Sequence, residues 1–343
     1  MLSLMLLSLS ILPVIGLQDY EPTPSSELWT SYVIRSYGVI QRAIQGTFIC
    51  FDKEVYNWTE IQLATDLANM AQVDMNILVI QYSIRINEDG NSHSIYPSSL
   101  FTKDPNIQIN DPIDVILTRS EEIGIHVFIG LGMILNQTGS YHPTWEIGFQ
   151  TEIANELWNK YGNHSSFYGW YIPDEYENNI WWKENNATGY LSQVAGYLKN
   201  ISHNKPVMIS PYFGDPSYKP GYLSPSDTQK WWTNVLADAQ IDIVATQDGI
   251  GCDRNITFEK VRQYYSAIQN ACESNGVDHW ANIEIFNISN WEPADIARIK
   301  EQIEVGDQYS TKIICYEFAH YMDPQMGNKQ KELYENYKLH LSE

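Results

Sequence analysis

Eight short apolar runs, separated by longer segments with helical periodicity, are the feature that most restricts the fold of this chain. The segment after the first run shows the pattern, because Thr59 and Gln62 form a capping box and apolar residues then recur at three- to four-residue spacing. Strands that alternate with helices predict a parallel sheet. The runs are residues 46–51, 77–81, 126–132, 167–172, 207–210, 243–246, 280–285 and 312–316.

The number of units selects one kind of parallel sheet. Eight strand–helix units close a (β/α)8 TIM barrel, an α/β fold, so we predict a single barrel domain over residues 18–343. No Gly-x-Gly-x-x-Gly follows the first run, which disfavours an open nucleotide-binding sheet. Long segments leave the runs and short ones enter them, so we expect the function at the C-terminal face of the barrel. The long segments are 85–110, 134–143, 176–187 and 213–225.

The N-terminus is typical of a signal peptide. Met1 to Leu17 is apolar and ends near Val14-Ile-Gly16, a small-residue cleavage pattern. Residues 1–17 are therefore expected to direct secretion, with an uncleaved anchor as the alternative. Seven sequons for N-glycosylation agree with a secreted or lysosome-like glycoprotein. They begin at Asn57, Asn136, Asn163, Asn186, Asn200, Asn255 and Asn287.

The charge of the chain restricts its partners. A net charge of −21 argues against nucleic acid and against anionic membrane surfaces beyond the signal peptide. It suits neutral or cationic substrates, although solubility alone would explain it as well. The histidines are scattered without metal-binding spacing, and no Gly-x-Ser-x-Gly elbow is present. The sequence thus indicates neither a metal nor another cofactor, and it does not give the oligomeric state.

None of the four cysteines has the Cys-x-x-Cys spacing of a zinc site. Cys252 and Cys272 flank one predicted helix in a chain expected to meet an oxidising compartment, so we predict a disulfide between them. Cys50 and Cys315 fall on the first and eighth strands, which are neighbours in a closed barrel. They could be bridged or could be two packed thiols.

Two glutamates close predicted strands on opposite sides of the ring. Glu175 follows the fourth strand and Glu284 ends the seventh. Such a pair predicts a retaining glycosidase, with Glu175 as acid/base and Glu284 as nucleophile, about 5 Å apart. Burial among aromatic residues would raise the pKa of Glu175 toward the range in which an acid/base works. The alternatives are a solvated loop acid for Glu175 and an ion-pair partner for Glu284, and Glu317 at the end of strand eight competes as nucleophile.

Other polar and aromatic residues surround the same predicted opening. Hydrogen-bonding side chains end several strands, and aromatic rings can stack on sugars, although each alone could equally serve solvation or packing. The predicted substrate-binding residues are Gln81, Tyr82, Tyr212, Gln247, Asp248, Asp174, Glu317, His320, Tyr321 and Trp58.

Several motifs resemble one family of TIM-barrel proteins in the glycoside hydrolase superfamily, the domain of unknown function 4434. The resemblance implies the barrel fold and a glycoside hydrolase, and the alternative is a non-catalytic sugar-binding protein on the same scaffold. The glutamate pair is also similar to a retaining glycosidase clan, but Asp174 stands where that clan usually has Asn. The matching stretches are Gly46-Thr-Phe, Ile80-Gln-Tyr, Gly169-Trp-Tyr-Ile-Pro-Asp-Glu175, Ile209-Ser-Pro-Tyr-Phe213, Gln247-Asp-Gly-Ile-Gly251, Trp280-Ala-Asn-Ile-Glu284 and Tyr316-Glu-Phe-Ala-His-Tyr-Met-Asp-Pro324.

Overall fold

The computed structural model describes residues 43–52, 54–87, 92–135, 143–179, 184–252 and 255–342. The predicted signal peptide and the sequon at Asn136 lie outside these residues. No helix within the described part of the chain combines the length and apolar character that crossing a membrane requires.

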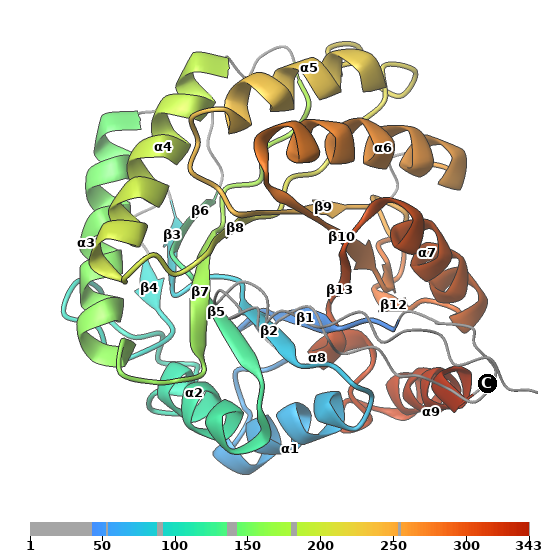
Figure 1. Cartoon of the computed structure of the whole chain (residues 1–343). Helices are drawn as coiled ribbons and strands as arrows, with labels where there is room; N and C mark the ends of the chain where they lie inside the picture. The colour runs from blue at the N-terminus through green and yellow to red at the C-terminus, as the bar shows by residue number, and fades with distance from the viewer. Residues whose placement is uncertain are drawn as a thin grey trace, which may run out of the picture. The chain divides into compact units, whose positions relative to one another are not determined.

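Eight parallel strands close into a barrel, which confirms the predicted fold (Figure 1). The order around the ring follows the chain, and the last strand pairs with the first. The barrel strands are β1 (Gly46–Ile49), β2 (Ile77–Ile80), β5 (His126–Gly130), β7 (Phe167–Ile172), β8 (Val207–Ile209), β9 (Ile243–Gln247), β10 (Asp278–Glu284) and β13 (Lys312–Tyr316).

Helices surround this ring in Figure 1. Thr59 caps the first with the predicted capping box, and Asp111 caps the second with Pro112 in its first turn. The helices are α1 (Glu60–Ala71), α2 (Pro112–Ile123), α3 (Pro143–Tyr161), α4 (Glu184–Ile201), α5 (Pro225–Leu236), α6 (Phe258–Asn275), α7 (Ile296–Tyr309), α8 (Phe318–Tyr321) and α9 (Asn328–Ser342).

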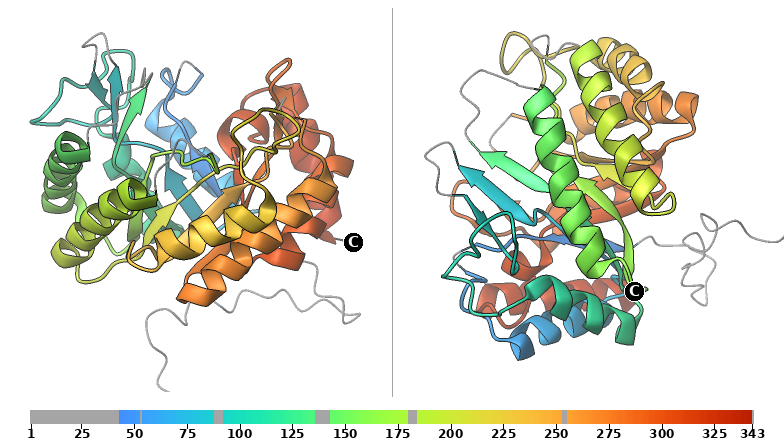
Figure 2. Two further views of the ribbon diagram at one scale, coloured as in Figure 1. Left: turned by 90° about the horizontal axis from the view of Figure 1, so that it is seen from above. Right: turned by 90° about the vertical axis from the view of Figure 1, so that its left-hand side faces the viewer.

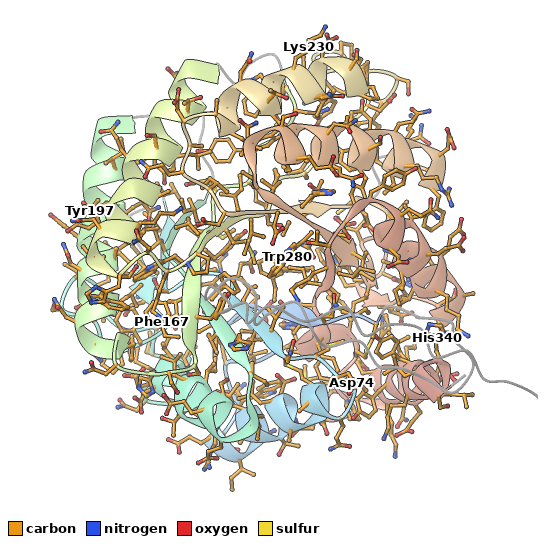
Figure 3. All side chains as sticks on the ribbon, viewed as in Figure 1. Asp74, Phe167, Tyr197, Lys230, Trp280 and His340 are labelled. Atoms are coloured by element: carbon orange, nitrogen blue, oxygen red, sulfur yellow. The ribbon has the colours of Figure 1, made fainter. Side chains whose placement is uncertain are left out.

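The barrel has two apolar layers because side chains alternate along each strand. Ile77 and Val79 belong to the cluster inside the barrel, whereas Leu78 and Ile80 pack outward beneath the helices. Trp280 also belongs to the interior cluster, and Figure 3 shows it at the centre of the ring. The same alternation decides which residues near the strand ends face the barrel axis.

Two small sheets lie in segments that the sequence indicated as loops or helix. A three-stranded sheet of β4 (His93–Ser94), β3 (Ile84–Asn87) and β6 (Gly132–Leu135) follows β2 and β5, and Figure 2 shows it in teal and green at one end of the barrel. A hairpin of β11 (Phe286–Asn287) and β12 (Glu292–Pro293) precedes α7. The helix that follows the seventh barrel strand therefore begins only after this hairpin, at Ile296.

Candidate active site

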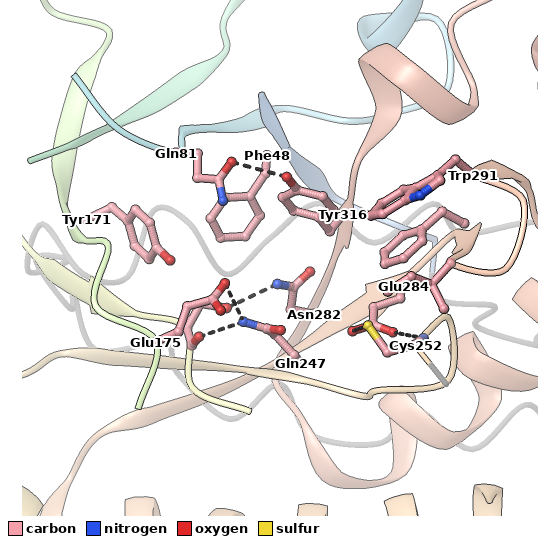
Figure 4. Close-up of a pocket in the computed structure, with 13 residues that line it drawn as sticks. Phe48, Gln81, Tyr171, Glu175, Gln247, Cys252, Asn282, Glu284, Trp291 and Tyr316 are labelled. Carbon is pink, nitrogen blue, oxygen red and sulfur yellow. Dashed lines mark hydrogen bonds between the residues drawn. The ribbon is translucent and has the colours of Figure 1, made fainter. Parts of the chain in front are cut away.

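A cavity of about 180 Å³ opens at the C-terminal end of the strands (Figure 4). Strand periodicity explains part of its wall. Asn282 and Glu284 follow the interior residue Trp280 at intervals of two, so all three share the inner face of β10. The wall includes Gln81, Glu175, Gln247, Asn282, Glu284 and Tyr316. Both glutamates of the predicted pair thus lie on one cavity.

Glu284 is held in place by the loop that follows β9. Its side chain is buried, with 3% of the residue exposed. The backbone N–H of Cys252 donates to Oε2 at 2.8 Å, and the Cys252 thiol donates to Oε1 at 3.3 Å. Gly251 packs so closely that a Cβ there would lie 2.8 Å from Glu284 Cβ. Neighbouring backbone and side-chain groups therefore define the position of this carboxylate.

Glu175 lies on the same wall in a different environment. It is exposed, so the expected burial among aromatic residues is not observed. Pro173 and Asp174 lead the chain out of β7, and the preceding Asp174 turns toward Tyr190, which leaves Glu175 at the opening. Gln247 Nε2 lies 3.4 Å from Glu175 Oε1 and also donates to Ser210 O at 3.0 Å. The carboxyl of Glu175 can therefore exchange protons with solvent.

Asp248 supports Glu284 from behind the wall and does not line the cavity. It is 1% exposed and accepts hydrogen bonds from the backbone N–H of Glu284 at 3.2 Å and from Gln302 Nε2 at 2.6 Å. Desolvation, together with the nearby charge of Glu284, raises the pKa of Asp248 to about 7. Its geometry is that of a positioning residue, not of a residue that contacts a ligand.

Other predicted binding residues point elsewhere. The Tyr82 hydroxyl donates to the carbonyl of Phe51 at 2.6 Å, and the Tyr212 hydroxyl donates to Glu177 Oε2 at 2.8 Å. Neither tyrosine is among the residues that line the cavity. Only Gln81 and Gln247 of the predicted polar ring reach its wall. A position at a strand end therefore predicted the cavity wall correctly for Gln81 and Gln247. Tyr82 and Tyr212 also follow strands, but their hydroxyl groups bond to residues more than 30 positions away and not to the cavity.

Three more predicted residues, Asp174, Trp58 and Tyr321, do not line the cavity. Asp174 accepts from the Tyr190 hydroxyl at 2.5 Å, and burial raises the pKa of Asp174 to about 7. Trp58 is buried in the outer apolar layer. Tyr321 stacks on Phe286 with ring centroids 5.3 Å apart, so it supports a wall residue from outside.

The Glu317 side chain bonds to His320. It is 1% exposed, its Oε1 contacts His320 Nδ1, and His320 Nε2 lies 2.7 Å from Asp52 Oδ1. None of these three lines the cavity. Asp52, Glu54 and His320 bring ligand atoms within 4.8 Å of one another, a grouping within the described residues that could hold a cation. Motif spacing cannot reveal it, because more than 260 residues of the chain separate His320 from the two acids.

Sequence reasoning missed several wall residues, including Ser210, Cys252, Asn282 and Tyr316. Asn282 and Tyr316 had a usable signal, because each lies two residues after an interior strand residue, Trp280 or Ile314. Cys252 had no such signal, since its place depends on the conformation of the loop after β9.

The structure contains no disulfide between Cys252 and Cys272, in contrast to the prediction. Cys252 lies at the mouth beside Glu284, whereas Cys272 is near the far end of α6, about 20 Å along the axis from Phe258 at 1.5 Å per residue. Cys50 and Cys315 occupy neighbouring strand regions as expected, but they remain separate thiols.

The predicted glycosylation sites differ in accessibility. Five of the asparagines are exposed: Asn57, Asn163, Asn186, Asn200 and Asn255. Asn287 is half-buried, and its side chain bonds to Pro293 and Arg298. Modification of Asn287 would break these contacts, which makes it the poorest acceptor of the described sequons.

Residues 44–328 match the family described as "Domain of unknown function (DUF4434)". The chain belongs to this family. No curated protein matches the chain. The match spans all eight barrel strands and every residue of the cavity wall, so the site described above lies within the family domain.

Solved structures share the fold of this DUF4434 protein at low sequence identity. A candidate alpha-L-fucosidase from Bacteroides thetaiotaomicron is 23% identical, with a TM-score of 0.76 over 88% of this chain and 96% of its own. An endo-1,4-beta-D-mannanase from Thermotoga petrophila is 14% identical, with a TM-score of 0.57 over 87% and 99%. A beta-D-glucuronidase from Dictyoglomus thermophilum is 13% identical, with a TM-score of 0.54 over 88% and 51%. These structures show that the barrel fold is common to glycoside hydrolases.

Proposed function

We propose that the protein is a glycoside hydrolase in which Glu175 is the acid/base and Glu284 the nucleophile. The observation that carries this proposal is the placement of both carboxylates, from the ends of β7 and β10, on the wall of one cavity at the barrel mouth. Active sites of TIM-barrel enzymes lie at this face. The glycosidases that share the fold support a carbohydrate substrate.

The environments of the two glutamates suit different roles. Glu175 would donate its proton to the glycosidic oxygen as an Oε atom of Glu284 attacks the anomeric carbon and the leaving alcohol departs. Glu175 would then take a proton from water, the water oxygen would attack the anomeric carbon, and Glu284 would be released. Glu284 needs a fixed position for the attack, which Cys252 and Gly251 provide. Glu175 needs access to water, which its exposure provides.

Substitution of each glutamate by glutamine tests these roles. With an aryl glycoside whose leaving group needs no protonation, Glu175→Gln should still form a glycosyl-enzyme, and azide should restore its turnover. Glu284→Gln should form no covalent adduct in mass spectra of the intact protein. Glu317→Gln is the matched control, since Glu317 is a buried acid near the mouth that does not line the cavity. Loss of the adduct in Glu317→Gln but not in Glu284→Gln would refute the assignment.

A sugar-binding protein without turnover is the second candidate. The observation that favours it is the burial of Glu284, whose two carboxylate oxygens both contact Cys252. Measuring glycan binding and cleavage on the same sample separates the two functions. Binding without release of reducing sugar across a panel of aryl glycosides and polysaccharides would support this second function and contradict the first.

We also propose that residues 1–17 are a signal peptide, that residues 18–343 form the barrel domain, and that the protein is glycosylated. The apolar N-terminus and the exposed asparagines of five sequons support this. Expression in a eukaryotic secretory host should give protein in the medium whose mass falls on treatment with an N-glycosidase. Retention of the full chain inside the cell, without glycan, would contradict the proposal.

A further inference from the structure

Asn282 carries an acceptor that the fold leaves unused. The residue is 2% exposed and lies on the cavity wall (Figure 4). Its Nδ2 donates to Ser210 Oγ at 3.1 Å, but its Oδ1 has no hydrogen-bond partner among the described residues. A buried acceptor without a donor is costly, so such an atom on a cavity wall indicates a ligand that supplies the donor.

The charges around the cavity restrict that ligand. Two carboxylates, Glu175 and Glu284, lie on the wall, and the described residues that line it include no Lys, Arg or His. Arg298 is close to Glu284 in the fold, but its guanidinium donates to the backbone carbonyls of Glu284 and Phe286. An anionic ligand would thus meet negative charge without the cationic partner that carboxylates usually require.

The size of the cavity restricts the ligand as well. Its volume of about 180 Å³ is the space of about six waters at ~30 Å³ each. Pockets that enclose drug-sized molecules have ~300–1,000 Å³. The enclosed part of a ligand is therefore about one sugar ring, and any further rings would extend past Trp291, which is 61% exposed at the rim.

We propose that the cavity binds one neutral sugar ring and rejects the matching uronic acid, with Asn282 Oδ1 accepting a hydrogen bond from a ring hydroxyl. This inference rests on the proposed function only in placing a sugar at this cavity. A neutral hexose offers several hydroxyl donors to the acceptors on the wall. The uronic acid replaces the C6 hydroxyl donor by a carboxylate, which has no proton to donate and which the Glu284 carboxylate repels.

Matched sugars test the selectivity without turnover. Saturation-transfer NMR with the full protein should detect glucose, galactose, mannose or fucose at millimolar concentration, and glucuronate or galacturonate should bind at least 100-fold more weakly than its neutral partner. Equal or tighter binding of either uronate would overturn the proposal. Failure to detect any neutral sugar would also overturn it.

Variants at the wall test the cause of the selectivity. Asn282→Leu removes the unused acceptor at similar volume and leaves Ser210 Oγ bonded to the carbonyl of Ala245. We expect unchanged melting and at least tenfold weaker binding of the neutral sugar, whereas Asn270→Ala on the exposed face of α6 should change neither. Ile288→Arg places a cation on the wall and should strengthen uronate binding at least tenfold. Wild-type neutral-sugar binding by Asn282→Leu would refute the role of Asn282.

The outcomes separate this inference from the proposed function. Neutral-sugar binding with no cleavage of any glycoside would contradict the hydrolase assignment and still support the selectivity. Cleavage of 4-nitrophenyl glucuronide at the rate of 4-nitrophenyl glucoside would support the hydrolase and overturn the selectivity. Arg254 lies outside the described residues and is tested by Arg254→Ala. If the wild type bound uronate and this variant did not, Arg254 would be the cation that binds the carboxylate, and the proposal would be overturned.

Discussion

Replacing Gly251 by alanine should displace Glu284 while leaving the barrel folded. A Cβ at Gly251 would lie 2.6 Å from the carbonyl oxygen of Phe286, 2.8 Å from Glu284 Cβ and 3.1 Å from Glu284 Oε2. Two of these three atoms belong to the proposed nucleophile. Ordinary contact begins near 3.4 Å, so the loop must move by about 0.8 Å from the Phe286 carbonyl and by about 0.6 Å from Glu284 Cβ, or these atoms must move instead.

Such a shift has a size that kinetics can detect. A misplacement of ~1 Å costs about 100-fold in rate, so Gly251→Ala should lower kcat/KM by about 10- to 100-fold. The added methyl group should also cost about 1–3 kcal/mol of stability through overpacking. The assay is kcat/KM on an aryl glycoside that the wild type cleaves, below both melting temperatures. Neutral-sugar binding by NMR gives a second measurement that does not need turnover.

Gly148→Ala is the matched control for this substitution. Gly148 lies in α3, and nothing comes within 4 Å of a Cβ built there. Activity should be unchanged, and the folded state should gain ~0.5–1 kcal/mol because alanine favours the helix. Wild-type kcat/KM and melting temperature in Gly251→Ala would show that Glu284 is not held by this contact and would refute the reasoning.

Burial raises the folded-state pKa of Asp174 to about 7, so between about pH 4 and 7 the unfolded chain loses a proton that the folded protein keeps. Wild-type stability should therefore fall as pH rises through this window. The melting temperature of Asp174→Asn should rise relative to that of the wild type over the same window. An equal difference in melting temperature between the two proteins at about pH 4 and at about pH 7 would contradict this. Glu317→Gln weakens the buried contact with His320 and should cost about 1–3 kcal/mol in denaturant unfolding with kcat almost unchanged. Thr59→Ala removes a capping box and should lower stability by ~1 kcal/mol in the same assay, and an unchanged midpoint would contradict the role of the cap.

Features that depend on local sequence were predictable. The cap at Thr59 and the start of α2 at Pro112 each need only a few adjacent residues. The eight strands could be counted because each is a short apolar run between helices. Placing Glu284 toward the barrel axis required only the two-residue period of β10.

Features that depend on distant partners were not predictable from one sequence. Gln302 lies 54 residues after Asp248, and His320 bonds to Asp52 across 268 residues. Ile84 pairs with Gly132 in a small sheet whose strands are too short to show a period. The predicted disulfide failed for a simpler reason, since the helix between Cys252 and Cys272 carries the second cysteine away from the mouth.

The position of Cys252 on the cavity wall allows intact folded molecules to be counted by thiol labelling. Burial raises the pKa of the Cys50 and Cys315 thiols to about 12 and also raises that of Cys272, so the reactive thiolate is scarce at these three positions. Cys252 lies on the cavity wall, where a small alkylating reagent can enter. One label per molecule would then report an intact mouth, and four labels would report an unfolded chain.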